Sequence, residues 1–131
     1  MKERYERIEK LRAAWNLRKN STESEIRIVS RDLLVTTDAI DQVTNKLATT
    51  ENSMQHFQDI SFRYLVGMVD LRNKMLQTRS GLQTKRLAEA SNERMCEIIE
   101  DKLNQEIKAT QSAADLREIL ELLVRLDKGS G

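Results

Sequence analysis

A seven-residue repeat of apolar side chains constrains the fold of this chain more than any other feature. With Ile26 at heptad position a, the seventeen a and d positions through Leu82 hold thirteen apolar residues, four Ser or Thr, and no charged residue. Yet 33% of all residues are Asp, Glu, Lys or Arg. The register continues for about eight heptads, well beyond the three or four that identify a coiled coil. The repeat therefore predicts an all-α chain built on coiled-coil packing.

The composition supports long helices. The chain contains no proline and only four glycines among 131 residues, so few positions favour a turn. This length suits one domain, which we place at residues 1–128. The terminal "GSG" at 129–131 resembles a linker or tag remnant and is left out of the fold.

Capping signals set the expected helix limits. Thr22 and Glu25 form a potential capping box, and Gly81, preceded by Arg79, is a potential helix terminator. They predict one long central helix over 22–79, roughly 85 Å in length at 1.5 Å per residue, and hence an elongated protein. In a compact monomer, this helix would instead break near Thr50 or Gly67. We expect shorter helices at 2–19, 82–109 and 112–127, with a single helix over 82–127 as an alternative.

The stretch "ISFRYLVGMVDLRNKML" (60–76) carries more apolar residues than one helical seam can bury. A stripe of this width predicts contact with two or more helices. We expect the first helix to fold back antiparallel beside 26–40 and the third beside 54–75, with Gly67 allowing a close approach. Thr36, Thr50, Ser61 and Thr78 at core positions disfavour a simple parallel dimer.

Two sets of residues are candidate contact sites. The predicted oligomer or partner interface consists of Leu33, Ile40, Val43, Leu47, Met54, Phe57, Ile60, Tyr64, Leu65, Met68, Leu71, Met75, Leu116, Leu120 and Leu123. The predicted contact with an acidic surface consists of Arg4, Arg7, Lys10, Arg12 and Trp15, on a basic helix with the apolar stripe Tyr5, Ile8, Leu11 and Trp15. The alternative for this first helix is packing on the bundle with a solvated basic face. The "ILELL" stretch (119–123) fits either a docking helix or core packing.

Residues that could carry chemistry are few. His56 is the only histidine and falls at an outward heptad position, so it can build neither a metal site nor a catalytic triad. Cys96 lies beside an apolar stripe and is expected to be a structural thiol. Glu93, Glu97, Glu100 and Asp101 lie on adjacent turns of one helix and are expected to form a solvated acidic face. We therefore predict no cofactor, no metal and no enzymatic activity.

These features favour a structural module that joins chains, as a dimer or tetramer or with another helical protein. Such modules occur in cytoskeletal, motor, tethering and kinetochore-like assemblies. The alternative is a sensor or secretion-chaperone bundle that binds a ligand or client between its helices. A net charge of +1 gives no global attraction for nucleic acid. We expect a cytoplasmic location and no membrane contact, because charges interrupt every apolar run before about 18 residues.

Overall fold

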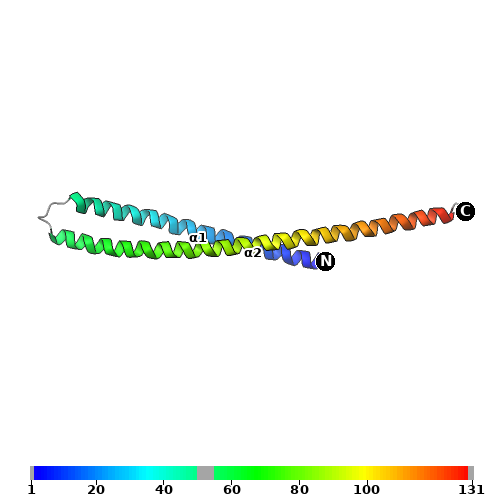
Figure 1. Ribbon diagram of the computed structural model, residues 1–131, viewed down its shortest axis with the longest axis horizontal. Coiled ribbons are helices and arrows are strands. Elements are labelled where there is room, and N and C mark those ends of the chain that lie inside the picture. The colour runs from blue at the N-terminus through cyan, green and yellow to red at the C-terminus, as the bar shows by residue number, and fades with distance from the viewer. Residues whose placement is uncertain (1, 50–54, 130–131) are drawn as a thin grey trace. The chain divides into compact units, whose positions relative to one another are not determined.

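Two helices make up the part of the chain that the computed structural model describes, residues 2–49 and 55–129, with side chains from residue 58 onward in the second range. Helix α1 spans Lys2–Thr49 and helix α2 spans Gln55–Gly129, with 48 and 75 residues (Figure 1). No strand occurs within these residues. The all-helical prediction is thus confirmed, with two helices packed against each other.

The predicted helix limits are wrong. Helix α1 continues through Thr22, and α2 continues through Gly67, Gly81 and Ser112. Neither Gly67 nor Gly81 has a positive φ, so neither ends a helix. A cap or a helical glycine changes helix stability by only about 1 kcal/mol, less than continuous packing against a second helix provides. The alternative of one helix over 82–127 is correct.

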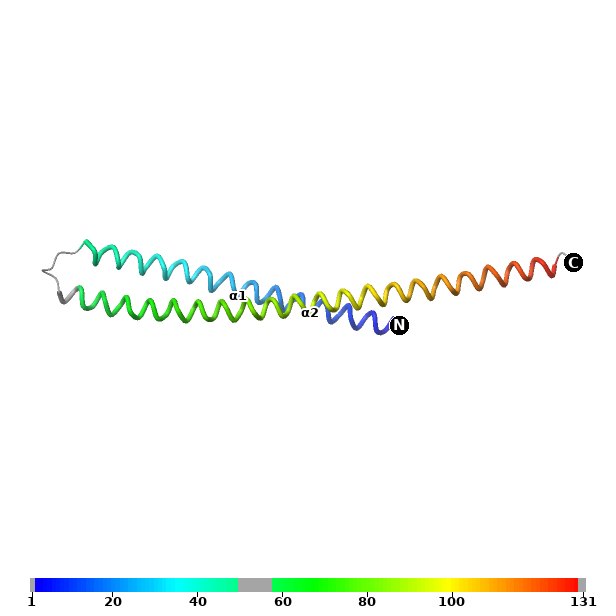
Figure 2. The backbone as a smooth tube through the Cα atoms, viewed as in Figure 1, coloured from blue at the N-terminus to red at the C-terminus, as the bar shows by residue number. Residues whose placement is uncertain are grey.

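The chain divides into two compact units, which we describe separately: Leu17–Glu89, and Met1–Asn16 together with Ala90–Gly131. In the first unit, α1 and α2 lie antiparallel (Figure 2). Thr22 contacts Glu89, and Thr36 contacts Met75. In both contacts the two residue numbers add up to 111, which fixes the register of the pair. The predicted central helix over 22–79 is therefore replaced by two helices that lie side by side.

The heptad repeat identifies the buried face of α1 correctly. Between Lys19 and Leu47, every a and d residue of α1 is buried or half-buried, and Leu33, Thr36 and Ile40 are at most 7% exposed. On α2 the prediction that the d residues are buried is wrong. The a residues, such as Met68 and Met75, do face α1, but the residues that share the contact with them are at position e, such as Leu65 and Arg72. The d residues Tyr64, Leu71 and Thr78 are exposed.

In the second unit, the start of α1 packs on a later part of α2. Cys96 and Leu103 are buried, and Tyr5, Ile8, Arg12 and Trp15 are half-buried. The prediction that the first helix folds back beside 26–40 is wrong, because Asn16 contacts Glu93 and Tyr5 contacts Glu100. The stripe also contains Arg12 in place of the predicted Leu11, which is 47% exposed.

A buried polar pair lies in the contact between the helices of the 17–89 unit. The hydroxyl of Thr22 donates a hydrogen bond of 2.6 Å to Oε1 of Glu89, and the two residues are 2% and 4% exposed. Next to it, Arg86 pairs with Glu23 at 2.9 Å. A buried carboxylate is costly unless a donor stabilises it, so the pair favours the register that brings these residues together.

Replacing Thr22 should test this pair. Thr22→Val keeps the shape of the side chain but removes the hydroxyl that Glu89 accepts from, so we expect the free energy of unfolding to fall by about 1–3 kcal/mol. Urea denaturation followed by circular dichroism at a fixed protein concentration measures the change.

Thr84→Val is the matched control. The hydroxyl of Thr84 is exposed and bonds to the Ser80 carbonyl of its own helix at 3.1 Å, so we expect a change within about 0.5 kcal/mol. Equal effects of the two substitutions would contradict a stabilising role for the buried pair.

Candidate interaction surfaces

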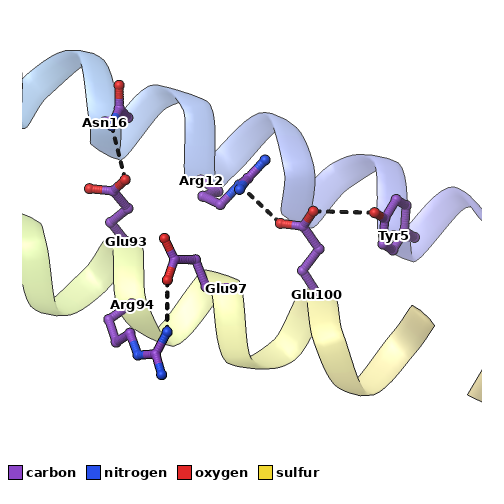
Figure 3. Close-up of polar contacts among 7 residues, drawn as sticks. All are labelled: Tyr5, Arg12, Asn16, Glu93, Arg94, Glu97 and Glu100. Atoms are coloured by element: carbon purple, nitrogen blue, oxygen red, sulfur yellow. Dashed lines mark hydrogen bonds and ion pairs between the residues drawn. The ribbon is translucent and has the colours of Figure 1, made fainter. Parts of the chain in front are cut away.

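A polar cluster joins the helices of the second unit (Figure 3). Glu100 accepts a hydrogen bond of 3.2 Å from the Tyr5 hydroxyl, and its other oxygen lies 2.9 Å from Nε of Arg12. About two turns away along α2, Asn16 donates to Glu93 at 2.9 Å. Each contact joins α1 to α2, so the cluster positions one helix along the other.

The cluster corrects the expected solvated acidic face. The side chain of Glu100 is only 13% exposed, and Glu93 is half-buried against Asn16. Glu97 pairs with Arg94 of its own helix at 2.9 Å. Among the described residues, no group of three or more His, Cys, Asp or Glu could hold a metal ion. The heptad could have revealed this arrangement, since Tyr5 and Arg12 fall at position a when the register is extended backwards from Ile26.

The predicted acidic-surface residues separate into three groups. Arg4 and Arg7 line a groove of about 460 Å³ with Lys102 and Glu106 and with the apolar Ile8, Ile99 and Leu103. Lys10 is exposed outside this groove. Arg12 and Trp15 face α2, and Arg12 is already paired with Glu100. Only Arg4 and Arg7 are thus combined with a further cation and an apolar surface.

The predicted interface residues also separate, according to whether α1 and α2 already cover them. The buried or half-buried members are Leu33, Ile40, Val43, Leu47, Leu65, Met68 and Met75. The exposed members are Ile60, Tyr64, Leu71, Leu116, Leu120 and Leu123. Met54 and the side chain of Phe57 lie outside the described residues, as does the side chain of His56. The first group holds the chain's own helices together, and the second remains accessible.

Three exposed residues and a glycine form one stripe on α2, which we call the outer stripe: Ile60, Tyr64, Gly67 and Leu71. Their spacing of four, three and four residues places them on one helix face, beside the face that contacts α1. The three side chains are 42–55% exposed, and a Cβ added to Gly67 would meet nothing within 4 Å. The close approach predicted at Gly67 is therefore not made by α1. Phe62, Val66 and Leu76 add apolar surface elsewhere on the same segment.

The end of α2 presents a second accessible surface. Lys2 and Glu3, at the start of α1, line a groove with Ile107, Thr110 and Gln111. Beyond this point α2 continues past the start of α1 (Figure 1), and every residue from 108 to 129 is exposed. We call residues 113–129 the terminal segment. Its seven large apolar side chains are 52–69% exposed: Leu116, Ile119, Leu120, Leu122, Leu123, Val124 and Leu126.

Comparison of the chain with protein-family models, with curated proteins and with solved structures found no match. In the residues that the structure describes, neither helix contains a stretch apolar enough to cross a membrane.

Cys96 is free and 5% exposed, as expected of a thiol that packs in the contact between helices.

The Tyr5–Glu100 contact should be visible in a titration. The hydrogen bond to Glu100, together with partial desolvation, raises the pKa of the Tyr5 hydroxyl above its ordinary value of 10.0. In Tyr64→Phe protein, Tyr5 is the only tyrosine, and its absorbance at 295 nm should change at a higher pH than that of free tyrosine. The neutral hydroxyl is the donor, so the bond should persist below pH 10 and be lost as the pH rises through the raised pKa.

Glu100→Gln in the same background is the comparison. It removes the negative charge that opposes ionisation of Tyr5, so the pKa should return towards 10.0. An unchanged titration midpoint would show that the contact does not exist in solution.

Proposed function

We propose that this chain is a non-enzymatic helical module that assembles with other helical chains, its own copies included. The observation that carries the proposal is the outer stripe of α2. A single antiparallel partner covers one face of α2, and the apolar residues of 60–76 extend beyond that face. Large apolar residues at helical spacing are costly to leave in water, and each contributes about 1.5–3 kcal/mol when fully buried.

The position of the outer stripe suits a further helix. The a residues of α2 contact α1, while Tyr64 and Leu71 at d lie on the side of that contact. A helix placed against the stripe would pack beside α1, in the manner of a three- or four-helix arrangement. Gly67 lies midway between Tyr64 and Leu71, where open space would let the backbone of the partner approach closely. The assemblies named from the sequence, such as cytoskeletal, motor, tethering or kinetochore-like complexes, remain candidate settings.

Gly67→Trp is the sharpest test of this surface. The substituted side chain has room in the chain itself, and tryptophan has a better helix propensity than glycine, so the helix content should be unchanged or slightly higher. The indole would occupy the space that a partner helix needs. We expect self-association through the outer stripe to weaken, with the dissociation constant of that step rising about tenfold or more, measured by sedimentation and light scattering across a concentration series.

Gly81→Trp is the matched control. Gly81 has the same heptad position and equally open surroundings, but its neighbours on the stripe are the polar residues Lys74, Thr78 and Lys85. We expect no change in mass. A chain that stays monomeric at every concentration and binds no helical protein, or equal effects of both tryptophans, would contradict the proposal.

Met68→Asp should act differently, because Met68 is half-buried against α1. A carboxylate in this contact loses hydration and the apolar packing of the methionine, and Arg72, four residues along the same helix face, offsets only part of that cost, so the helix pair should be destabilised by about 1–3 kcal/mol. Loss of helical circular dichroism on mild heating is the readout. Unchanged helicity and mass would contradict the packing described for the 17–89 unit.

The second candidate function is contact with an acidic partner. It is favoured by the groove lined by three cations, Arg4, Arg7 and Lys102, and by one carboxylate, Glu106, together with the apolar Ile8, Ile99 and Leu103. A groove with an excess of cations beside apolar side chains suits a peptide that combines acidic and apolar residues. Binding that weakens strongly with salt, and that is lost in Arg4→Glu with Arg7→Glu, would distinguish it from contact through the outer stripe.

A further inference from the structure

We propose that the terminal segment of α2 pairs with the same segment of a second copy of this chain, antiparallel and about a twofold axis near Glu121. This inference extends the proposed assembly function and names one partner and one register. It concerns a surface separate from the outer stripe, within the unit formed by residues 1–16 and 90–131.

The sequence of the terminal segment reads nearly the same in both directions. "DLREILELLVRLD" (115–127) has its centre at Glu121. Asp, Leu, Arg and Leu recur at equal distances on either side, Ile119 mirrors Leu123, and only Glu118 and Val124 differ in kind. In an antiparallel pair centred on Glu121, each residue lies at the same level along the helix axis as its mirror position in the second copy. Leu116 then faces Leu126, and Ile119 faces Leu123, so every central layer is apolar.

The residues beside these layers also favour the antiparallel orientation. With Leu116, Ile119, Leu123 and Leu126 in the centre, Leu120 and Leu122 flank them on opposite sides. In an antiparallel pair, the side of one helix that carries Leu120 lies against the equivalent side of the other helix, so Leu120 approaches Leu120 of the second copy, and likewise Leu122 approaches Leu122. In a parallel pair, the side that carries Leu120 lies against the side that carries Leu122. Leu120 would then adjoin Asp115, and Leu122 would adjoin Asp127, which leaves carboxylates against leucines.

The register also fits the space available. The mirror position of Gly129 is Ala113, just beyond Gln111, where the start of α1 lies beside α2. In this register, residues 113–129 of the second copy lie along the exposed part of α2 that begins just beyond Gln111. A twofold pair of this kind closes on itself and does not form fibres.

The charges of the segment favour a second copy over a charged partner. The terminal segment, 113–129, contains three Lys or Arg and four Asp or Glu, so its net charge is −1. Two copies therefore repel each other only weakly, and neither a strongly acidic nor a strongly basic surface is attracted overall. Two helices of this length make a small interface, for which we expect a dissociation constant of about micromolar.

Cysteine cross-linking of the full chain tests the pairing and its orientation together. Leu116→Cys and Leu126→Cys should each give little cross-linked dimer in a glutathione redox buffer, because each cysteine faces a leucine of the second copy. An equimolar mixture should give a disulfide-linked heterodimer in high yield. Wild-type protein provides the baseline, since its only thiol, Cys96, is buried. Efficient cross-linking of Leu116→Cys alone would overturn the antiparallel register.

Solution mass separates this inference from the proposed function. Leu120→Asp should weaken dimerisation at least tenfold, whereas Asn104→Asp, which adds the same charge at an exposed polar residue, should not. The Gly67→Trp protein should still form the antiparallel dimer. If Gly67→Trp abolishes assembly and Leu120→Asp does not, the proposed function stands and this inference is overturned. If only Leu120→Asp abolishes assembly, the terminal pairing is supported and the role of the outer stripe fails.

Discussion

The structure depends on the burial of one narrow apolar face of α1 against α2. Neither helix has a globular core to pack on, so the a and d residues of α1 must be covered by α2 along its length. This contact is thin, and few residues in it are fully buried: Leu33, Ile40, Cys96 and Leu103 are the apolar ones among the described residues. With so little core, the polar pairs within the contact decide how the helices align. An apolar stripe with a seven-residue repeat would otherwise tolerate shifts of one heptad.

Three polar contacts provide that alignment. Thr22 with Glu89 belongs to the 17–89 unit, whereas Asn16 with Glu93 and the group of Tyr5, Arg12 and Glu100 belong to the other. Each places a carboxylate of α2 against a donor of α1. A shift of one heptad would leave these carboxylates partly buried without their donors, at a cost that apolar contacts of this size would not offset. The arrangement parallels the use of buried polar residues to specify register in coiled coils.

The sequence predicted the helical class and the buried face of α1, because the heptad signal from Ile26 to Leu47 is free of charge and long. It failed at three places for physical reasons. Thr22 and Gly81 match local capping patterns, but continuous packing outweighs a cap. Arg12 and Lys19 at position a interrupt the apolar repeat before Ile26, so the repeat did not indicate that the contact extends back to Tyr5. The same heptad count runs unchanged from α1 into α2, so the repeat suggested one helix where the chain forms two.

The shift from a and d on α1 to a and e on α2 explains why apolar surface remains. A helix that contacts its partner through a and e turns its d residues to one side, and on α2 these include Tyr64 and Leu71. Burying them against α1 would require rotating α2, which would move Leu65 and Met68 away from the contact and expose them instead. One partner helix cannot cover both sets, because together they span more of the helix circumference than a single neighbour contacts. The apolar excess therefore belongs to α2 itself, and the proposed assembly with a further helix rests on this surface.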